Sequence, residues 1–510
     1  MVDIDDIEFK RKALQDSLDS QKTLKERNRL GQFSTPKILS DSIVKAALAY
    51  NKDEIRFLDT SIGTGVFFSS LLACSDRHTV LYAQGYEVDK HYAIPAMELW
   101  QGTKINYFLG DFFDFTPPQK NDEKFNVIIS NPPYIRHHYI INEVKKKLNE
   151  RIQLNFGLSF SGLMGLYGYF LALSALWLQD NGISVWLVPN EFLDVNYGEE
   201  IKTFLLTKVN LLRIHRFNPE NVQFSDALVT STVVFYTTGI TAAPVLFTTG
   251  QDINNPDYQK KIAFQRLCPN DKWSHYFSSQ KQRNKPMNTI GDYFSVKRGI
   301  ATGSNKHFIL TNEQVEKINI PNKYIKSILP SPRYIKDNVI KISKDGYIGD
   351  IQSKYLLNIT CLEHEIVDLP QKLIDYLNII YSEVKDNYII RNRSPWFKQE
   401  YRPECPFLMS YMSRNTKEPF RLFLNKTNAT APNVYLMLYP KFDWKKAEVQ
   451  NEGFLDYLHN NLQRISAETF VSSGRVYGGG LYKLEPKELM SVPLDDILSE
   501  YLINLEVFVV

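Results

Sequence analysis

The residues best suited to chemistry form the tetrapeptide Asn131-Pro132-Pro133-Tyr134, which directly follows an apolar stretch at 125–130. The Asn131 side-chain oxygen and the Pro132 carbonyl oxygen can accept both hydrogens of a planar amine and stabilise the charge that develops when its nitrogen is methylated. The prolines restrict the backbone, so both acceptors need little reorganisation. Tyr134 offers a ring on which a flat base can stack. The tetrapeptide predicts methyl transfer to a planar nitrogen.

A glycine-containing turn earlier in the chain could bind a nucleoside. Residues 57–65 have the pattern of a buried strand that runs into Gly63 and Gly65, where the missing Cβ lets the backbone approach a ligand. A dinucleotide-binding fingerprint would need a third glycine near position 68, and the chain has Phe68 there. The turn therefore predicts a ligand without phosphates, such as S-adenosylmethionine.

Two further strand ends carry carboxylates. Glu87 ends the second predicted strand and could accept hydrogen bonds from two ribose hydroxyls. Asp111 and Phe112 follow the third strand, where they offer an acceptor for an adenine amine and an aromatic face beside it. Ligand-type residues at three successive strand ends predict a nucleoside site.

The elements that must hold these residues form an α/β domain. Short apolar strands alternate with helical segments, at 56–59, 81–87, 105–109, 125–130, 183–188, 211–217 and 232–237. Most are separated by enough chain for a helical crossover, but the last two are not, so we expect the seventh to pair antiparallel with the sixth. A seven-stranded, mostly parallel Rossmann-like sheet of this kind is typical of S-adenosylmethionine-dependent methyltransferases.

The strand and helix pattern changes after Tyr236, which predicts two domains. We expect a catalytic domain over residues 1–243, with a helical leader at 1–29, and a mixed α+β domain over 244–510. The net charge of +3 arises in the second half, because residues 251–510 are basic whereas residues 1–250 are slightly acidic. This division fits a catalytic domain joined to one that contacts phosphates.

Composition excludes several classes of protein. The 4 cysteines are scattered singly, which argues against disulfides and cysteine zinc sites. The N-terminus lacks the pattern of a signal peptide, and the apolar run at 163–178 is too short to cross a bilayer. His137 and His138 have no matching acidic cluster, so we expect no metal. Cytoplasmic residence is the default expectation.

Several segments together resemble the amino-methyltransferases of restriction-modification systems, specifically the γ-ordered adenine-N6 group typified by the Taq I methylase and the Eco57I-like enzymes. Besides the glycine turn and the tetrapeptide, these segments are Gly31-Gln32-Phe33-Ser34-Thr35-Pro36, Leu166-Tyr167-Gly168-Tyr169-Phe170 and Val188-Pro189-Asn190-Glu191-Phe192. In the second half, residues 297–303 and 474–481 resemble recognition-domain segments. One departure is Thr60, where the family commonly has proline.

The resemblance implies a site-specific methylase that transfers a methyl group from S-adenosylmethionine to the N6 amine of a flipped adenine in duplex DNA. In this role Thr35 contacts the methionine end of the cofactor, and Phe224 sandwiches the adenine against Tyr134. The second domain would be the target-recognition domain, with Asn415 among its candidate base contacts. A cognate restriction endonuclease would act in the same system, and we expect a monomer or weak dimer.

These interpretations give three sets of candidate residues. The predicted catalytic residues are Asn131, Pro132, Tyr134 and Phe224. The predicted cofactor-binding residues are Thr35, Asp59, Gly63, Gly65, Glu87, Val88, Asp111, Phe112, Asn131 and Pro133. The predicted DNA-binding residues are Lys297, Arg298, Arg333 and Arg475.

Four alternatives stay open at this point. Glutamine-N5 methyltransferases of release factors share the tetrapeptide, although those chains are short and lack both the 31–36 segment and a second domain. Cytosine-N4 methyltransferases usually have serine or aspartate in place of Asn131. The chain could also be an inactive DNA-binding subunit, or the modification subunit of a larger restriction complex.

Overall fold

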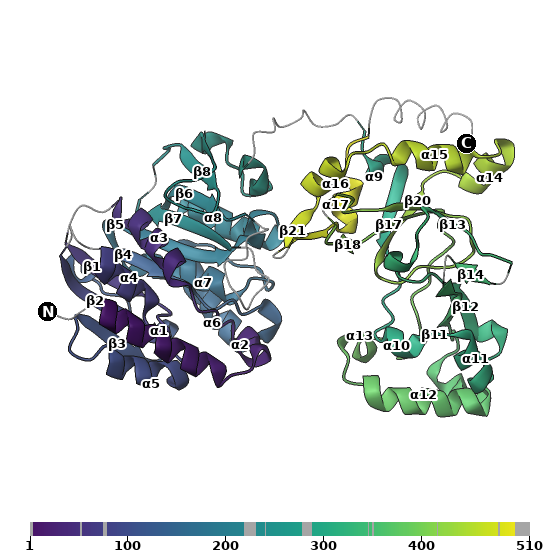
Figure 1. Cartoon of the computed structure of the whole chain (residues 1–510), viewed down its shortest axis with the longest axis horizontal. Coiled ribbons are helices and arrows are strands. Elements are labelled where there is room, and N and C mark those ends of the chain that lie inside the picture. Colours follow the sequence, from purple (N-terminus) through teal and green to yellow (C-terminus); the bar gives the residue numbers. More distant parts are fainter. Residues whose placement is uncertain are drawn as a thin grey trace. The chain divides into compact units, whose positions relative to one another are not determined.

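The computed structural model describes residues 4–50, 54–74, 79–218, 231–239, 241–277, 288–344, 346–348, 351–415, 417–477 and 480–494. The chain divides into two compact units (Figure 1), and the first extends to Gln282. The boundary expected at 243/244 is thus placed too early. The boundary lies later because the segment after residue 243 adds strands to the sheet of the first unit instead of starting a new core.

Nine strands form the sheet of the first unit in the part of the chain that the structure describes. In spatial order they are β3 (Ile105–Leu109), β2 (Val80–Glu87), β1 (Ile55–Asp59), β4 (Phe125–Ser130), β5 (Leu178–Pro189), β7 (Ser231–Thr237), β6 (Asn210–Arg216), β8 (Val245–Thr249) and β9 (Tyr258–Ile262). All seven predicted strands are present, and β7 pairs antiparallel with β6 as expected. The prediction missed β8 and β9.

The strand order places the first and fourth strands side by side. Strands β1, β2, β3, β4 and β5 are mutually parallel, so their carboxyl ends share one edge of the sheet. The order reverses between β1 and β4, because β2 and β3 extend one way and β5 the other. Ligands of open α/β sheets bind at such a reversal point, outside the carboxyl ends of the strands.

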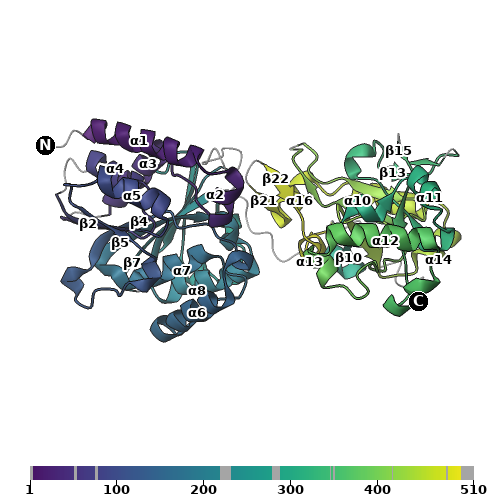
Figure 2. The same ribbon diagram turned by 90° about the horizontal axis from the view of Figure 1, so that it is seen from below.

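Helices cover both faces of this sheet (Figure 2). On one face lie α1 (Ile4–Ser20), α3 (Lys37–Leu48), α4 (Val66–Cys74) and α5 (Lys90–Leu99), whose apolar residues share a core with those of β1. On the other face lie α6 (Asn142–Phe156), α7 (Leu166–Leu173) and α8 (Glu199–Thr207). The leader expected at 1–29 is helical as α1 and α2 (Leu24–Leu30). Within the described ranges, no helix is long and apolar enough to cross a membrane.

The second unit combines small sheets with helices, as expected. Its largest sheet contains β10 (Phe294–Arg298), β20 (Tyr435–Pro440), β17 (Phe407–Ser410), β19 (Leu422–Asn425) and β13 (Val339–Ile340). The smaller sheets contain β11 (Ile309–Leu310), β16 (Lys354–Leu357) and β12 (Ile325–Ile328); β14 (Tyr347–Ile348) and β15 (Ile351–Gln352); and β18 (Met412–Ser413), β22 (Leu481–Lys483) and β21 (Arg475–Tyr477). The helices are α9 (Ile290–Tyr293), α10 (Asn305–Phe308), α11 (Asn312–Ile318), α12 (Gln371–Val384), α13 (Tyr388–Arg391), α14 (Trp444–Gln450), α15 (Phe454–Leu462), α16 (Ala467–Ser473) and α17 (Pro486–Met490).

Candidate active site

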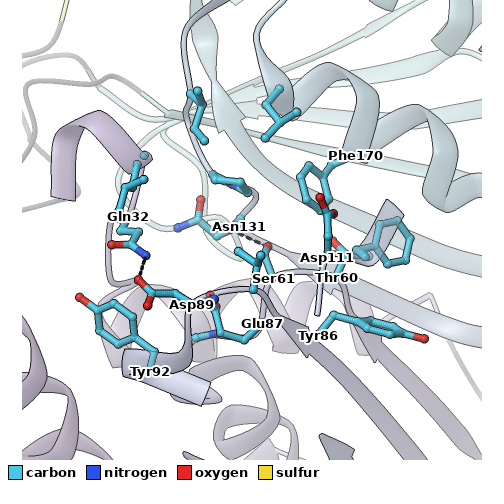
Figure 3. A pocket seen from close by; sticks show the side chains of 18 of the residues that line it. Gln32, Thr60, Ser61, Tyr86, Glu87, Asp89, Tyr92, Asp111, Asn131 and Phe170 are labelled. Atoms are coloured by element: carbon cyan, nitrogen blue, oxygen red, sulfur yellow. Dashed lines mark hydrogen bonds between the residues drawn. The ribbon is translucent and has the colours of Figure 1, made fainter. Parts of the chain in front are cut away.

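A cavity of about 780 Å³ opens at the carboxyl edge of strands β1 to β4 (Figure 3). Its size lies within the usual range for small-molecule sites. Seven predicted site residues line it: Gly63, Glu87, Val88, Asp111, Phe112, Asn131 and Pro133. The four strand ends that the sequence singled out therefore meet in one cavity.

Asn131 lines this cavity, and its amide is bonded on one side only among the described residues. Its Nδ2 donates to the Phe33 carbonyl oxygen and to the Thr35 hydroxyl, both at 3.1 Å. These two bonds fix the orientation of the amide and leave Oδ1 on the other side. Oδ1 is buried and has no hydrogen-bond partner among the described residues. A buried acceptor without a partner is costly, so it indicates that a ligand supplies the donor.

The 31–36 segment lies against the tetrapeptide. Gly31 ends α2 in the left-handed conformation with φ of 65°, and its carbonyl accepts from the Tyr134 N–H at 3.2 Å. A Cβ at this position would lie 2.4 Å from the Tyr134 nitrogen, so only glycine permits the contact. The sequence alone gave Gly31 no separate role, because this contact depends on residues a hundred positions apart.

Glu87 is held from behind by backbone donors. Its two carboxylate oxygens accept from the Gly63 N–H at 3.1 Å and from the Asp89 N–H at 2.9 Å. Burial raises the pKa of Glu87 to about 7, although these N–H groups favour the charged form. Since both oxygens retain further lone pairs, the carboxylate can accept hydrogen bonds from a diol in the cavity.

Asp59 supports the site without lining the cavity. It is buried, and it accepts from the Ser130 hydroxyl at 2.6 Å and from the Ser61 N–H at 3.1 Å. Burial raises its pKa to about 7. The Ser61 hydroxyl in turn donates to the Asn131 carbonyl at 2.9 Å, so these bonds join the ends of β1 and β4.

An aromatic wall lies on the other side of the cavity. The Phe113 ring lies 4.4 Å from that of Phe170, and Phe112 stacks on Phe170 at 5.8 Å between ring centroids. Asp111 stands beside them, and burial raises the pKa of its carboxyl. Phe170 was part of a segment noted in the sequence but received no role there. Its place on α7 brings it to the cavity (Figure 3).

Gln32 and Asp89 also line the cavity and were not predicted. The Gln32 side chain donates to the Asp89 carboxylate at 2.7 Å, and Lys22 pairs with the same carboxylate. Burial would raise the pKa of Asp89, but these bonds hold it below its ordinary value. Gln32 lies inside the 31–36 segment and Asp89 directly follows the predicted Glu87 and Val88, so the polar side chains at these two positions were the available signal.

Five predicted residues lie behind the cavity wall instead of lining it: Thr35, Asp59, Gly65, Pro132 and Tyr134. A Cβ on Gly65 would lie 2.5 Å from the Trp100 indole nitrogen, so this glycine serves packing. Tyr134 is 8% exposed and its hydroxyl donates to the Leu187 carbonyl at 3.1 Å. Base stacking by Tyr134 stays a prediction. Phe224 lies outside the described residues.

The predicted DNA-binding residues lie on separate elements of the second unit. Lys297 and Arg298 are exposed at the end of β10, where the Arg298 guanidinium lies 4.1 Å from the Tyr411 ring centroid. Arg333 is exposed and lies over the ring of Tyr334. The guanidinium of Arg475, by contrast, donates to the buried Glu488 carboxylate at 2.6 Å.

Family models match both units of the chain. The model "Eco57I restriction-modification methylase" matches residues 67–223, and "Type II methyltransferase M.Eco57I, C-terminal domain" matches residues 270–505. The chain belongs to the Eco57I family of restriction-modification methylases. The tetrapeptide of this Eco57I-family methylase falls inside the first match, whereas its 31–36 segment and glycine turn precede it.

Known relatives of the Eco57I-family methylase agree with this assignment. It is 26% identical to the type II methyltransferase M.AccI of Acinetobacter calcoaceticus, over 92% of this chain and 85% of M.AccI. It is also 26% identical to M.XamI of Xanthomonas campestris pv. amaranthicola, over 71% of this chain and 66% of M.XamI. In fold it is similar to the type IIL restriction-modification enzyme MmeI in complex with DNA, with a TM-score of 0.58 and 13% identity over 93% of this chain and 69% of MmeI.

Proposed function

We propose that this methylase transfers the methyl group of S-adenosylmethionine to the N6 amine of an adenine in duplex DNA, as the modification enzyme of a restriction-modification system. The observation that carries the proposal is the Asn131 amide, whose two N–H bonds are satisfied and whose buried oxygen lacks a partner among the described residues. That oxygen accepts a hydrogen of the target amine.

The cavity fits S-adenosylmethionine. Glu87 would accept the ribose hydroxyls, and Asp111 with Phe170 and Pro133 would hold the adenine ring between an acceptor and apolar walls. The glycine turn and the 31–36 segment would hold the methionine end. When bound, the cofactor supplies a methyl group already activated by a sulfonium centre, so the protein needs no covalent nucleophile.

The tetrapeptide prepares the acceptor amine for attack. The lone pair of an adenine amine is delocalised into the ring, so the nitrogen is a poor nucleophile. Asn131 Oδ1 accepts one of its hydrogens, which favours a pyramidal nitrogen and stabilises its developing positive charge. The Pro132 carbonyl oxygen, predicted to accept the other hydrogen, belongs to a residue that does not line the cavity. Because the amide is already oriented by Phe33 and Thr35, this acceptor does not reorganise during the reaction.

In this proposal the second unit binds the DNA. The exposed cations Lys297, Arg298 and Arg333 suit contacts to the phosphate backbone. MmeI, the relative in fold, was solved in complex with DNA, which supports a DNA substrate for this chain as well. A base inside a duplex cannot reach a cavity at a sheet edge, so the adenine is flipped out of the stack. A cognate endonuclease acts on the same recognition sequence.

Transfer of label to DNA tests the proposal. The full chain is incubated with duplex DNA and S-adenosylmethionine labelled in the methyl group, and the digested nucleosides are separated. We expect labelled N6-methyl-2′-deoxyadenosine, and about 10²–10³-fold less of it with Asn131→Ala. Asn155→Ala, an exposed asparagine on α6, is the matched control and retains activity. Label on cytosine or on protein would support the alternative classes of enzyme and refute this one.

A further inference from the structure

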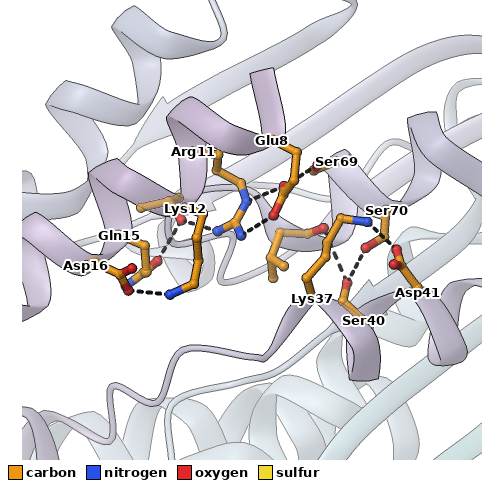
Figure 4. A network of polar contacts seen from close by, with 12 residues as sticks. Glu8, Arg11, Lys12, Gln15, Asp16, Lys37, Ser40, Asp41, Ser69 and Ser70 are labelled. Atoms are coloured by element: carbon orange, nitrogen blue, oxygen red, sulfur yellow. Dashed lines mark hydrogen bonds and ion pairs between the residues drawn. The ribbon is translucent and has the colours of Figure 1, made fainter. Parts of the chain in front are cut away.

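Helix α1 presents a polar stripe to the glycine turn at residues 62–65. Glu8, Arg11 and Gln15 recur at spacings of three and four residues, so they lie on one face of the helix. Figure 4 shows Glu8 and Arg11 side by side, with Ser69 of α4 next to the Glu8 carboxylate. Arg11 is only 2% exposed, a degree of burial that arginine tolerates only when its charge is paired.

The charge of Arg11 is paired within its own helix. Its Nε and Nη2 donate to the two carboxylate oxygens of Glu8, each at 2.7 Å. Burial would raise the pKa of Glu8, but hydrogen bonds from Arg11 and Ser69 hold it below its ordinary value. The pair is therefore ionised and fixed in orientation, and the Nη1 atom of Arg11 remains to reach the glycine turn.

Arg11 and Gln15 converge on Thr64 in that turn. Arg11 Nη1 donates to the Thr64 hydroxyl at 3.0 Å, and the hydroxyl donates to Gln15 Oε1 at 2.6 Å. Thr64 lies between Gly63 and Gly65, both of which have positive φ. Glycine adopts such backbone angles readily, and the turn is also held where the Gly63 N–H donates to Glu87 and the Trp100 indole donates to the Thr64 carbonyl. The Thr64 hydroxyl is thus the side-chain contact through which α1 restrains it.

The same helix reaches a second wall of the cavity. Gln15 Nε2 donates to Asp19 Oδ1 at 3.0 Å, and the Ser34 hydroxyl donates to Asp19 Oδ2 at 3.3 Å. Gln15 and Asp19 themselves line the cavity. One helix therefore touches both the glycine turn and the 31–36 segment that orients Asn131.

We propose that Arg11 and Gln15 are positioning residues, which hold the glycine turn through the Thr64 hydroxyl in the conformation that binds the cofactor. The inference rests on the proposed function, because it takes an adenosyl cofactor as the ligand. Arg11 and Thr64 act without touching the cofactor. Their effect is on the affinity of the folded protein for it, beyond any effect on stability.

Calorimetric titration of the full chain with S-adenosylhomocysteine tests this role. Thr64→Val keeps the shape of the side chain but removes both hydrogen bonds, and we expect the Kd to rise about five- to tenfold. Thr64→Ser restores the hydroxyl and should stay within about twofold of wild type. Arg11→Lys keeps the positive charge but loses the guanidinium, which bonds Glu8 and Thr64 at the same time. Its Kd should therefore rise as much as that of Thr64→Val. Lys10→Ala is the matched control, because Lys10 is exposed on the other face of α1, where it pairs with Asp6.

The thermal midpoint of each variant separates positioning from stability. A merely structural role would lower the midpoint and leave the Kd unchanged at a temperature where all the proteins are folded. Wild-type Kd values for Thr64→Val and Arg11→Lys would therefore overturn the inference. Failure of the wild-type chain itself to bind S-adenosylhomocysteine would instead overturn the proposed function, and the inference with it.

Discussion

At the scale of single residues, the site is built around groups whose hydrogen-bonding capacity is half used. Asn131 has satisfied donors and, among the described residues, an acceptor without a partner, whereas Glu87 lines the cavity and is held by two backbone N–H groups. In both residues the protein fixes one side and leaves the other to a ligand. Such prior orientation reduces the reorganisation that a reaction requires.

The orientation of Asn131 depends on Thr35. In Thr35→Val the hydroxyl that accepts from Asn131 Nδ2 is lost, so the amide retains only the Phe33 carbonyl. We expect kcat at saturating cofactor to fall about five- to tenfold, consistent with the loss of one hydrogen bond. Single-turnover kinetics measure this, and Thr35→Ser is the control that keeps the hydroxyl. Equal rates for the valine and serine variants would show that Thr35 does not orient the amide.

Glu87 makes cofactor binding depend on pH. Its pKa is raised to about 7 by burial, and the ionised form is the better acceptor for ribose hydroxyls. Affinity for S-adenosylhomocysteine should therefore rise as the pH passes through about 7, where half of the carboxylate is ionised, and level off roughly one pH unit higher. Calorimetry at several pH values measures this, with Glu87→Gln as a control that binds more weakly and with a flatter profile. Parallel profiles for the two proteins would exclude Glu87 as the titrating group.

The sequence predicted these residues because their chemistry is local. A carboxylate, a glycine or an amide at the end of a strand is visible in a few consecutive letters, as with Glu87, Gly63 and Asn131. Residues whose role depends on distant packing were missed, such as Phe170 of α7 and Gln32 beside Asp89. The position of Gly65 behind the cavity wall has the same origin, since only the packing shows that a Cβ there would meet Trp100.

At the scale of elements, the end of α2 and the tetrapeptide must meet without a side chain between them. Gly31 and Gly157 both cap helices with φ of 65°, but a Cβ on Gly157 would meet open space whereas one on Gly31 would meet the Tyr134 backbone. Gly157→Ala should therefore cost only the left-handed strain, about 1–2 kcal/mol. Gly31→Ala should cost a further 1–3 kcal/mol, roughly, for the steric overlap, and lower kcat as well.

Denaturant unfolding and methyl transfer, measured on both alanine variants, check this difference. Equal stability losses with retained activity in both would mean that the 31–36 segment does not press on the tetrapeptide.

The existence of most strands could be predicted from the sequence, since apolar runs and turns are local patterns. Strands β8 and β9 were missed because they follow a Pro-containing stretch and β9 is mostly polar, with the sequence Tyr-Gln-Lys-Lys-Ile.

At the scale of the whole molecule, the chain consists of a catalytic unit and a second unit whose boundary lies at 282. Residues 245–277 belong to the first, because β8 pairs with β6 and Phe247 packs against Trp273 in its core. A fragment of residues 1–282 should therefore unfold cooperatively and bind S-adenosylhomocysteine. A fragment of residues 1–243 exposes the edge of β6 and should aggregate.

Size-exclusion chromatography and calorimetry on the two fragments measure this outcome. A soluble, cofactor-binding fragment of residues 1–243 would show that the expected boundary, and not the later one, separates the folding units.

The fold class was predictable because alternating strands and helices leave a periodic pattern in the sequence. The boundary was not, because a strand that closes one sheet has the same local sequence as a strand that begins another.

The two partners of the hydrogen bond between Asn131 and Phe33 are synthesised at different times. The two residues are 98 positions apart, and ribosomes add about 5–20 residues per second. The 31–36 segment therefore emerges roughly 5–20 seconds before the asparagine that it orients. Until then the nascent chain holds a glycine turn and part of a cofactor wall, but no oriented amide. A ribosome that stalls within this interval leaves a fragment without the asparagine that the proposed methyl transfer requires.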